Sequence, residues 1–313
     1  RLINLIPTGT KIDFMRLRKP AAVSSLVLTV LSVILFGVLG LNYGIDFRGG
    51  IMVEIRTEQA ADMAGLRKNL SGLGLGEVEL QEFGQPTDVL IRVERQPGGE
   101  KAQAKAVETI KGALGDKVDY RRVEFVGPKV GAELINAGIT AVLMAMAAML
   151  VYIWFRFEWQ FGVGAVVALT HDVVLTIGIF ALLGLEFNLS IVAAILAIAG
   201  YSINDTVVVY DRVRENLRKY KRMDMNALLN MSINDTLSRT LLTSITTLLA
   251  LLALFFFGGQ VIKGFSFAMI WGVIVGTYSS IWIAVPLLVY MKLNPGGLIV
   301  GNLDDEEQGT SKG

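Results

Sequence analysis

The sequence predicts a polytopic α-helical membrane protein with six transmembrane helices and one extracytoplasmic α+β domain. Its 313 residues are 53% hydrophobic and only 18% charged, with a mean hydropathy of +0.54. A soluble protein of this length carries more charge than that. Six nearly apolar stretches are each long enough to cross about 30 Å of hydrocarbon as a helix. They are residues 21–43, 134–155, 161–184, 189–210, 236–258 and 265–290.

The remaining long segment, residues 44–133, has the pattern of a small folded domain. IMVEIR (51–56), EVELQEF (77–83), DVLIRVE (88–94) and KVDYRRVEFV (117–126) indicate strands, with GQPT as a hairpin turn. Residues 58–73 and 100–114 indicate helices between them. The order βαββαβ predicts a ferredoxin-like domain. It lacks a phosphate-binding glycine loop and a carboxylate pair with a base, which favours a binding or mechanical role.

The distribution of lysine and arginine predicts the orientation. These residues collect in the N-terminal segment 1–20 and in the segment 211–235, which is interpreted as a basic loop. The positive-inside rule then places both termini, this loop and the acidic tail 291–313 in the cytoplasm. The first apolar stretch is interpreted as an uncleaved anchor. We therefore expect a multi-pass protein of the cytoplasmic (inner) membrane, with the 44–133 domain on the other side.

The composition also excludes several kinds of catalytic and metal-binding site. The chain has no cysteine and a single histidine, His171. A disulfide framework, a thiol catalyst and a multi-histidine metal site are therefore excluded. We expect no metal, no cofactor, no nucleic-acid partner and no enzymatic activity.

Four groups that carry or exchange charge lie within the apolar stretches: His171, Asp172, Asp205 and Arg239. Such groups are costly in a membrane and mark functional sites. Asp205 and Arg239 lie at similar depth on antiparallel stretches, so we predict an ion pair between them. Several hydroxyls are predicted to extend this site as a proton path or as helix–helix polar contacts: Thr176, Ser202, Thr206, Thr243, Thr246 and Thr247. The same choice stays open for His171 and Asp172.

Two further patterns give expectations. The pentapeptide SINDT occurs at 202–206 and at 232–236. The first copy places Asp205 in apolar surroundings, whereas the second is predicted to start a helix at Asp235. The four-residue spacing of Gly272, Gly276 and Ser280 predicts close helix packing and not a functional site.

Three motifs carry a family resemblance. GIDFRGG (44–50), VGPKVGAEL (126–134) and GYSINDTVVVYDRVREN (200–216) resemble SecF proteins, a branch of the SecD/SecF protein-export membrane proteins in the RND superfamily. The resemblance covers about residue 8 to about residue 292. Arg48 departs from it, because related sequences usually have a small polar residue there. The motif-loop residues are Gly44, Asp46, Gly49, Gly50, Gly127, Pro128 and Gly131.

The resemblance implies a function. Such proteins associate with SecD and the SecYEG channel in the lipid bilayer. They use the proton-motive force to help pull preproteins outward at a late stage of translocation. The family's proton-transport residues match Asp205 and Arg239. Protonation of Asp205 would then release its attraction for Arg239 and let the helices rearrange.

Three alternatives remain. A scaffold that only stabilises SecD predicts that changes at Asp205 and Arg239 are silent. An intramembrane aspartyl protease would use Asp172 and Asp205 as its carboxylate pair. Half of a small-molecule RND exporter is disfavoured, because one domain of roughly ninety residues offers little room for a drug pocket.

Overall fold

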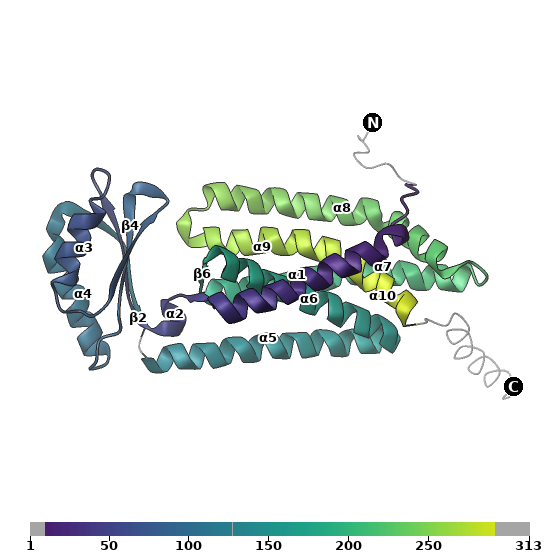
Figure 1. The fold of residues 1–313 in the computed structure, drawn as a ribbon, viewed down its shortest axis with the longest axis horizontal. Helices are drawn as coiled ribbons and strands as arrows, with labels where there is room; N and C mark the ends of the chain where they lie inside the picture. Colours follow the sequence, from purple (N-terminus) through teal and green to yellow (C-terminus); the bar gives the residue numbers. More distant parts are fainter. Residues whose placement is uncertain (1–9, 127, 292–313) are drawn as a thin grey trace, which may run out of the picture.

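The computed structural model describes residues 10–126 and 128–291. Residues 1–9 and 292–313 of the predicted terminal segments lie outside this description, as does Gly127 of the second motif. A long helical bundle carries a four-stranded sheet domain at one end (Figure 1). The described part of the chain contains six spans long and apolar enough to cross a membrane, as predicted.

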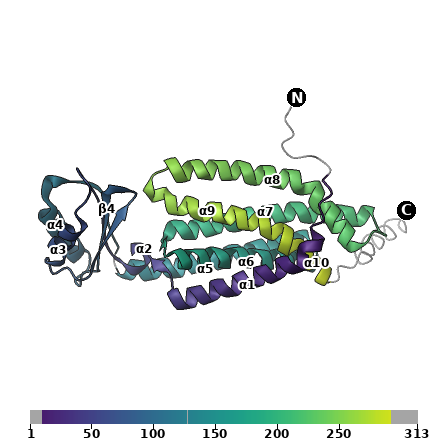
Figure 2. The same cartoon turned by 45° about the horizontal axis from the view of Figure 1, so that its top comes forward.

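The bundle is built from long helices that run nearly parallel to its axis (Figure 2). They are α1 (Arg18–Leu39), α5 (Pro128–Arg156), α6 (Trp159–Leu183), α7 (Leu189–Lys219), α8 (Met225–Phe257) and α9 (Gln260–Ser279). A short 3₁₀ turn, Met15–Leu17, precedes α1, and a π-helical segment, Ser280–Ala284, joins α9 to α10 (Val285–Tyr290). Pro128 and Gly131 of the second motif lie at the start of α5. Many side chains of α6 and α7 are buried, whereas α1 and α5 expose apolar side chains, as expected for lipid-facing helices.

Glycines allow the inner helices to approach closely. A Cβ added at Gly272 of α9 would lie 2.2 Å from Cγ1 of Ile198 on α7, and one at Gly276 would lie 3.3 Å from Cβ of Ser202. Small residues at a contact let two membrane helices pack backbone to backbone. The close packing predicted at Gly272 and Gly276 is therefore present.

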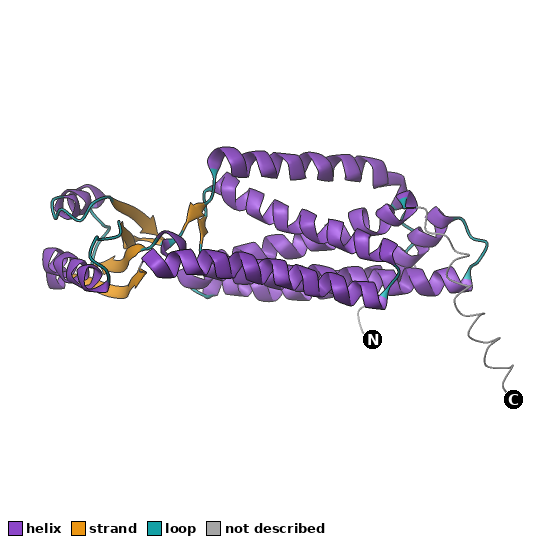
Figure 3. Cartoon of the chain, turned by 90° about the horizontal axis from the view of Figure 1, so that it is seen from below, coloured by secondary structure: helices purple, strands orange, loops and turns teal. Residues whose placement is uncertain are grey.

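The sheet domain has the predicted βαββαβ order: β2 (Gly50–Thr57), α3 (Met63–Ser71), β3 (Val78–Phe83), β4 (Gln85–Val93), α4 (Glu100–Leu114) and β5 (Val118–Val126). The strand order is β3-β4-β2-β5, and all neighbouring strands are antiparallel. Both helices cover one face of the sheet (Figure 3). Alternate apolar residues of the strands, such as Ile51, Val53 and Ile91, are fully buried against them. This confirms the predicted fold class.

Two local predictions in this domain need correction. The first helix begins at Met63 and not at residue 58, because the Asp62 carboxylate caps it by accepting the N–H of Gly65. The hairpin does not use GQPT as a four-residue turn. Gly84 alone, at φ +84°, reverses the chain between β3 and β4, so Gln85 already pairs with Phe83.

The predicted loop 211–235 is wrong. Helix α7 continues to Lys219, and α8 begins at Met225 with Asp224 as its cap. Nothing in 211–219 breaks a helix, and the two helices are joined beyond the apolar stretches by an Arg212–Asp235 ion pair at 2.8 Å. Asp235 therefore lies inside α8 and pairs with Arg212, and it is not the predicted helix start.

A small connector that the sequence analysis missed joins the bundle to the sheet domain. Strand β1 (Asn42–Tyr43) pairs in parallel with β6 (Glu186–Phe187) in the α6–α7 turn. The four-residue helix α2 (Ile45–Arg48) then leads into β2. Two-residue strands are too short to give a periodic pattern, so the sequence carries no signal for them.

Candidate functional site

The polar residues of the bundle form two adjacent carboxylate sites on α6, α7 and α9. Asp172 is on α6 and fully buried, and Asp205 is on α7 and 6% exposed. Each carboxylate lies in an apolar stretch of its helix. The chemistry of each site therefore depends on which donors the neighbouring helices supply.

Asp172 is well supplied with donors. Its Oδ2 accepts hydrogen bonds from Ser202 Oγ at 2.6 Å and from Ser279 Oγ at 2.7 Å. Its Oδ1 lies 3.0 Å from Nδ1 of His171. Thr176 instead bonds the Asp172 backbone carbonyl. Through these hydrogen bonds Asp172 links α6 to α7 and α9.

Asp205 has one well-formed side-chain hydrogen bond, to its Oδ2 from Ser280 Oγ at 2.9 Å. Thr240 of α8 lies close enough to interact with Asp205, yet its buried hydroxyl has no partner at hydrogen-bond geometry. Thr206 is buried beside Asp205 on α7. Asp205 therefore has fewer donors than Asp172, although both carboxylates are buried.

The predicted ion pair between Asp205 and Arg239 does not form. Arg239 is on an exposed face of α8, and no hydrogen bond or ion pair joins its guanidinium to Asp205, which is bonded to Ser280 instead. The helix places Thr236, Thr240 and Ser244, spaced four residues apart, toward the bundle interior. Arg239 precedes Thr240 by one residue and so lies about 100° away around the helix.

The hydroxyls predicted to continue from Arg239 also fail to converge on Asp205. Thr243 and Thr246 are exposed on α8 and bond to backbone carbonyls of the preceding turn. Thr247 is partly buried. In this part of α8 it is Ser244 that makes polar contacts with the bundle: its hydroxyl lies 3.0 Å from the Tyr201 hydroxyl and 2.7 Å from the Thr277 hydroxyl.

Ser279 and Ser280 are site residues that the sequence analysis did not identify. They are consecutive, both fully buried, and each binds a different carboxylate, Asp172 and Asp205 respectively. The π-helical segment begins at Ser280. Pro286, which follows it, has no N–H to donate, and π turns are frequent at functional sites. Ser280 thus makes a side-chain hydrogen bond that close packing alone does not require. The sequence signal for these site residues was the pair of adjacent serines, Ser279 and Ser280, ending six residues before Pro286 in an apolar stretch.

The arrangement does not suit the protease alternative. Asp172 and Asp205 are hydrogen-bonded to different serines and not to each other. A carboxylate pair that shares one proton requires direct contact. The described residues also contain no group of three or more side chains that could hold a metal ion.

Another buried carboxylate, Asp88 of the sheet domain, has a structural explanation. Arg56 of the neighbouring strand binds both of its oxygens, at 2.6 and 2.8 Å. The hydrogen-bonded Arg56 guanidinium holds the pKa of Asp88 below its ordinary value. This ion pair fastens β2 to β4, so Asp88 is not a candidate for proton exchange.

Comparisons with known proteins agree on one family. The model of the "Protein export membrane protein SecD/SecF, C-terminal" matches residues 106–294, and the "SecD/SecF GG Motif" matches residues 34–61. Proteins named protein translocase subunit SecF are similar over 91% of this chain. The one from Rickettsia rickettsii is 50% identical and that from Rickettsia conorii 49%, and 94% of each relative is covered.

Solved structures give the same result. The crystal structure of SecDF, a translocon-associated membrane protein from Thermus thermophilus, is 37% identical with a TM-score of 0.82, over 91% of this chain. SecDF in a super-membrane-facing form is 34% identical with a TM-score of 0.67, over 99% of this chain. The chain spans 39% and 41% of the length of these two SecDF chains.

Proposed function

Because the chain belongs to the SecD/SecF family of protein-export membrane proteins, we propose that it is a SecF-type subunit that draws preproteins across the inner membrane. It works with SecD at the SecYEG channel in the late stage of translocation, and the proton-motive force supplies the energy. The observation that carries this proposal is Asp205, a buried carboxylate on α7 with one well-formed hydrogen bond.

The surroundings of Asp205 suit a group that alternates between charged and neutral states. A buried carboxylate with few donors is costly when ionised and is relieved by taking up a proton. Arg239 on the neighbouring helix α8 carries a permanent positive charge, and a positive charge favours the ionised form of a carboxylate. The two influences oppose each other, so gaining or losing one proton changes the forces between α7, α8 and the Ser280 segment.

The electrical driving force is sufficient for such a change. One proton that crosses 100 mV supplies about 2.3 kcal/mol. That free energy shifts an equilibrium between two helix arrangements by about 40-fold. Asp205 and the Ser280 turn are the groups that would convert this energy into motion.

Arg239, Thr243 and Thr246 are exposed on α8. This polar face favours the proposal that a helix of another protein packs against α8. A guanidinium that faces lipid is costly, so a protein surface or water must cover it. The membrane helices of SecD are the proposed cover, because the solved SecDF chains are more than twice as long as this one. The basic end of α7 and the turn that follows it, with Lys221 and Arg222, face the cytoplasm in this arrangement, and the sheet domain lies outside, where it contacts the emerging chain.

Asp205→Asn tests the proposal, and Asp235→Asn in the other SINDT copy is its matched control. Both variants are assembled with SecD and SecYEG in vesicles, and late-stage export is measured with and without a proton gradient. We expect Asp205→Asn to lose the gradient-dependent component while the ATP-driven start of translocation continues. Asp235→Asn keeps both. Full gradient-dependent export by correctly assembled Asp205→Asn would refute the proposal.

A further inference from the structure

The connector helix α2 is fastened to both parts of the molecule by three consecutive side chains. Ile45 packs against Met52 and Leu90 on the sheet. Phe47 packs in the bundle, with its ring stacked on that of Phe187 at 6.1 Å between centroids. Between these two, the Asp46 carboxylate accepts the N–H of Leu189 at 2.9 Å, which is the first residue of α7. A helix N-terminus favours such a carboxylate.

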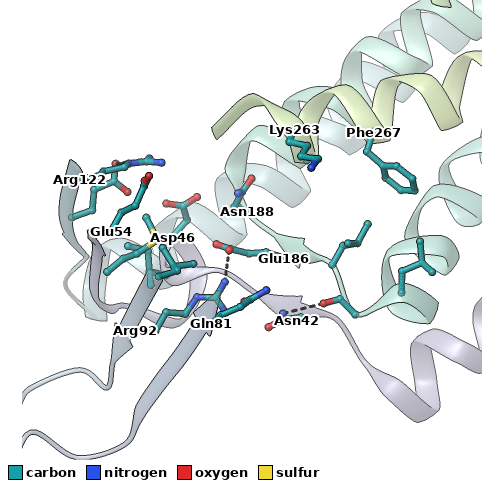
Figure 4. A pocket seen from close by; sticks show the side chains of 18 of the residues that line it. Asn42, Asp46, Glu54, Gln81, Arg92, Arg122, Glu186, Asn188, Lys263 and Phe267 are labelled. Atoms are coloured by element: carbon teal, nitrogen blue, oxygen red, sulfur yellow. Dashed lines mark hydrogen bonds and ion pairs between the residues drawn. The ribbon is translucent and has the colours of Figure 1, made fainter. Parts of the chain in front are cut away.

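A second link joins the sheet directly to the α6–α7 turn. Arg92 of β4 forms an ion pair with Glu186 of β6, on the sheet face opposite α3 and α4 (Figure 4). The two side chains are 16% and 26% exposed. Gly44 makes room for this pair, because a Cβ there would lie 2.6 Å from Oε1 of Glu186.

The space beside this ion pair is open. A cavity of about 450 Å³ lies between the sheet and the end of the bundle. Met52 and Leu90 line it on the sheet side. Lys263 and Phe267 of α9 line it on the bundle side (Figure 4). The facing surfaces are therefore not packed against each other here. The opposite face of the sheet is closed by a continuous apolar core, so the domain can move only as one body.

We propose that α2 is a pivot and that the Arg92–Glu186 ion pair is a releasable latch holding the sheet domain against the bundle. This inference rests on the proposed function, in which the domain moves during export. The two side chains are mostly buried, and the cost of desolvating both charges offsets much of their attraction, so the ion pair adds little net stability and the latch can open. Asp46 attaches the pivot to the first turn of α7, and Asp205 lies sixteen residues further along, about 24 Å away.

Charge reversal tests the latch without any export assay. Because the chain has no cysteine, spin labels at Glu108→Cys on α4 and Leu182→Cys on α6 report the distance between domain and bundle. In membranes with SecD, we expect Arg92→Glu and Glu186→Arg each to at least double the width of the distance distribution. The double reversal Arg92→Glu with Glu186→Arg restores it. Single reversals that leave the distribution unchanged would overturn the latch.

A reversible cross-link tests whether release is required. Arg92→Cys with Glu186→Cys is joined by a reductant-cleavable reagent about as long as the two side chains it replaces. We expect the linked protein to lose gradient-dependent export and to regain it after reduction. Full export by the linked protein would overturn the requirement for release. The Asp205→Asn result judges the proposed function separately, because the spin-label distances do not depend on proton coupling.

Discussion

We expect Asp172→Ala to destabilise the membrane-spanning bundle strongly. The substitution removes the side-chain acceptor of Ser202 and the partner of His171, and it leaves Ser279 with only the Gly276 carbonyl as its acceptor. A buried donor left without an acceptor costs about 1–3 kcal/mol. The losses fall on α6, α7 and α9 together, so the three helices should separate at a lower temperature.

Thermal unfolding in detergent measures this effect, with Asp172→Asn as the control. Asparagine keeps the shape of aspartate and one oxygen acceptor, so it should retain much of the stability. Asp172→Ala and Asp172→Asn of equal stability would show that the hydrogen bonds to Asp172 do not hold these helices together.

The second large effect is expected for Gly272→Ala. The new methyl group would lie 2.2 and 2.4 Å from Cγ1 and Cδ1 of Ile198, which is itself fully buried. The side chain of Ile198 cannot move far in a packed core, so α7 and α9 must shift apart. Overpacking of this kind costs about 1–3 kcal/mol.

Two controls isolate the steric cause. Gly200→Ala in α7 meets nothing within 4 Å and should be neutral or slightly stabilising. Ile198→Ala removes the side-chain atoms that clash, so Gly272→Ala should cost less stability in an Ile198→Ala background than in the unaltered protein. The melting temperature of each variant in detergent measures these differences in stability. A Gly272→Ala protein as stable as Gly200→Ala would contradict the close helix contact.

The sequence carries enough information for the main architecture. Uninterrupted apolar stretches are visible because a bilayer imposes a minimum helix length, and the period-two strands at 51–56 and 88–94 are visible because one face of the sheet is buried. Residues 211–235 were misjudged for a related reason. Their charges indicate solvent, but a solvated segment can continue as helix, and Asp224 sets the true start of α8.

The two carboxylates of the site could be predicted from the sequence, but the residues that hydrogen-bond to them could not. A lone aspartate in an apolar stretch is conspicuous, so Asp172 and Asp205 could be found from the sequence. Their partners depend on how the neighbouring helices are rotated. The π-helical segment brings Ser280 to Asp205, and the rotation of α8 leaves Arg239 on its exposed face. Local sequence does not determine such rotations. The two SINDT copies also show that local sequence is not sufficient. The same five residues place Asp205 in the buried interior and Asp235 in an ion pair with Arg212, because their surroundings differ.

The central claim is that Asp205 takes up and releases a proton during the working cycle. Infrared difference spectroscopy of the protein with SecD in membranes observes this directly, through the C=O stretch of a protonated carboxyl group as the pH is changed. The account predicts a pH-dependent carboxyl band that is lost in Asp205→Asn and kept in Asp172→Asn. A pH-dependent band that persists unchanged in Asp205→Asn would contradict it.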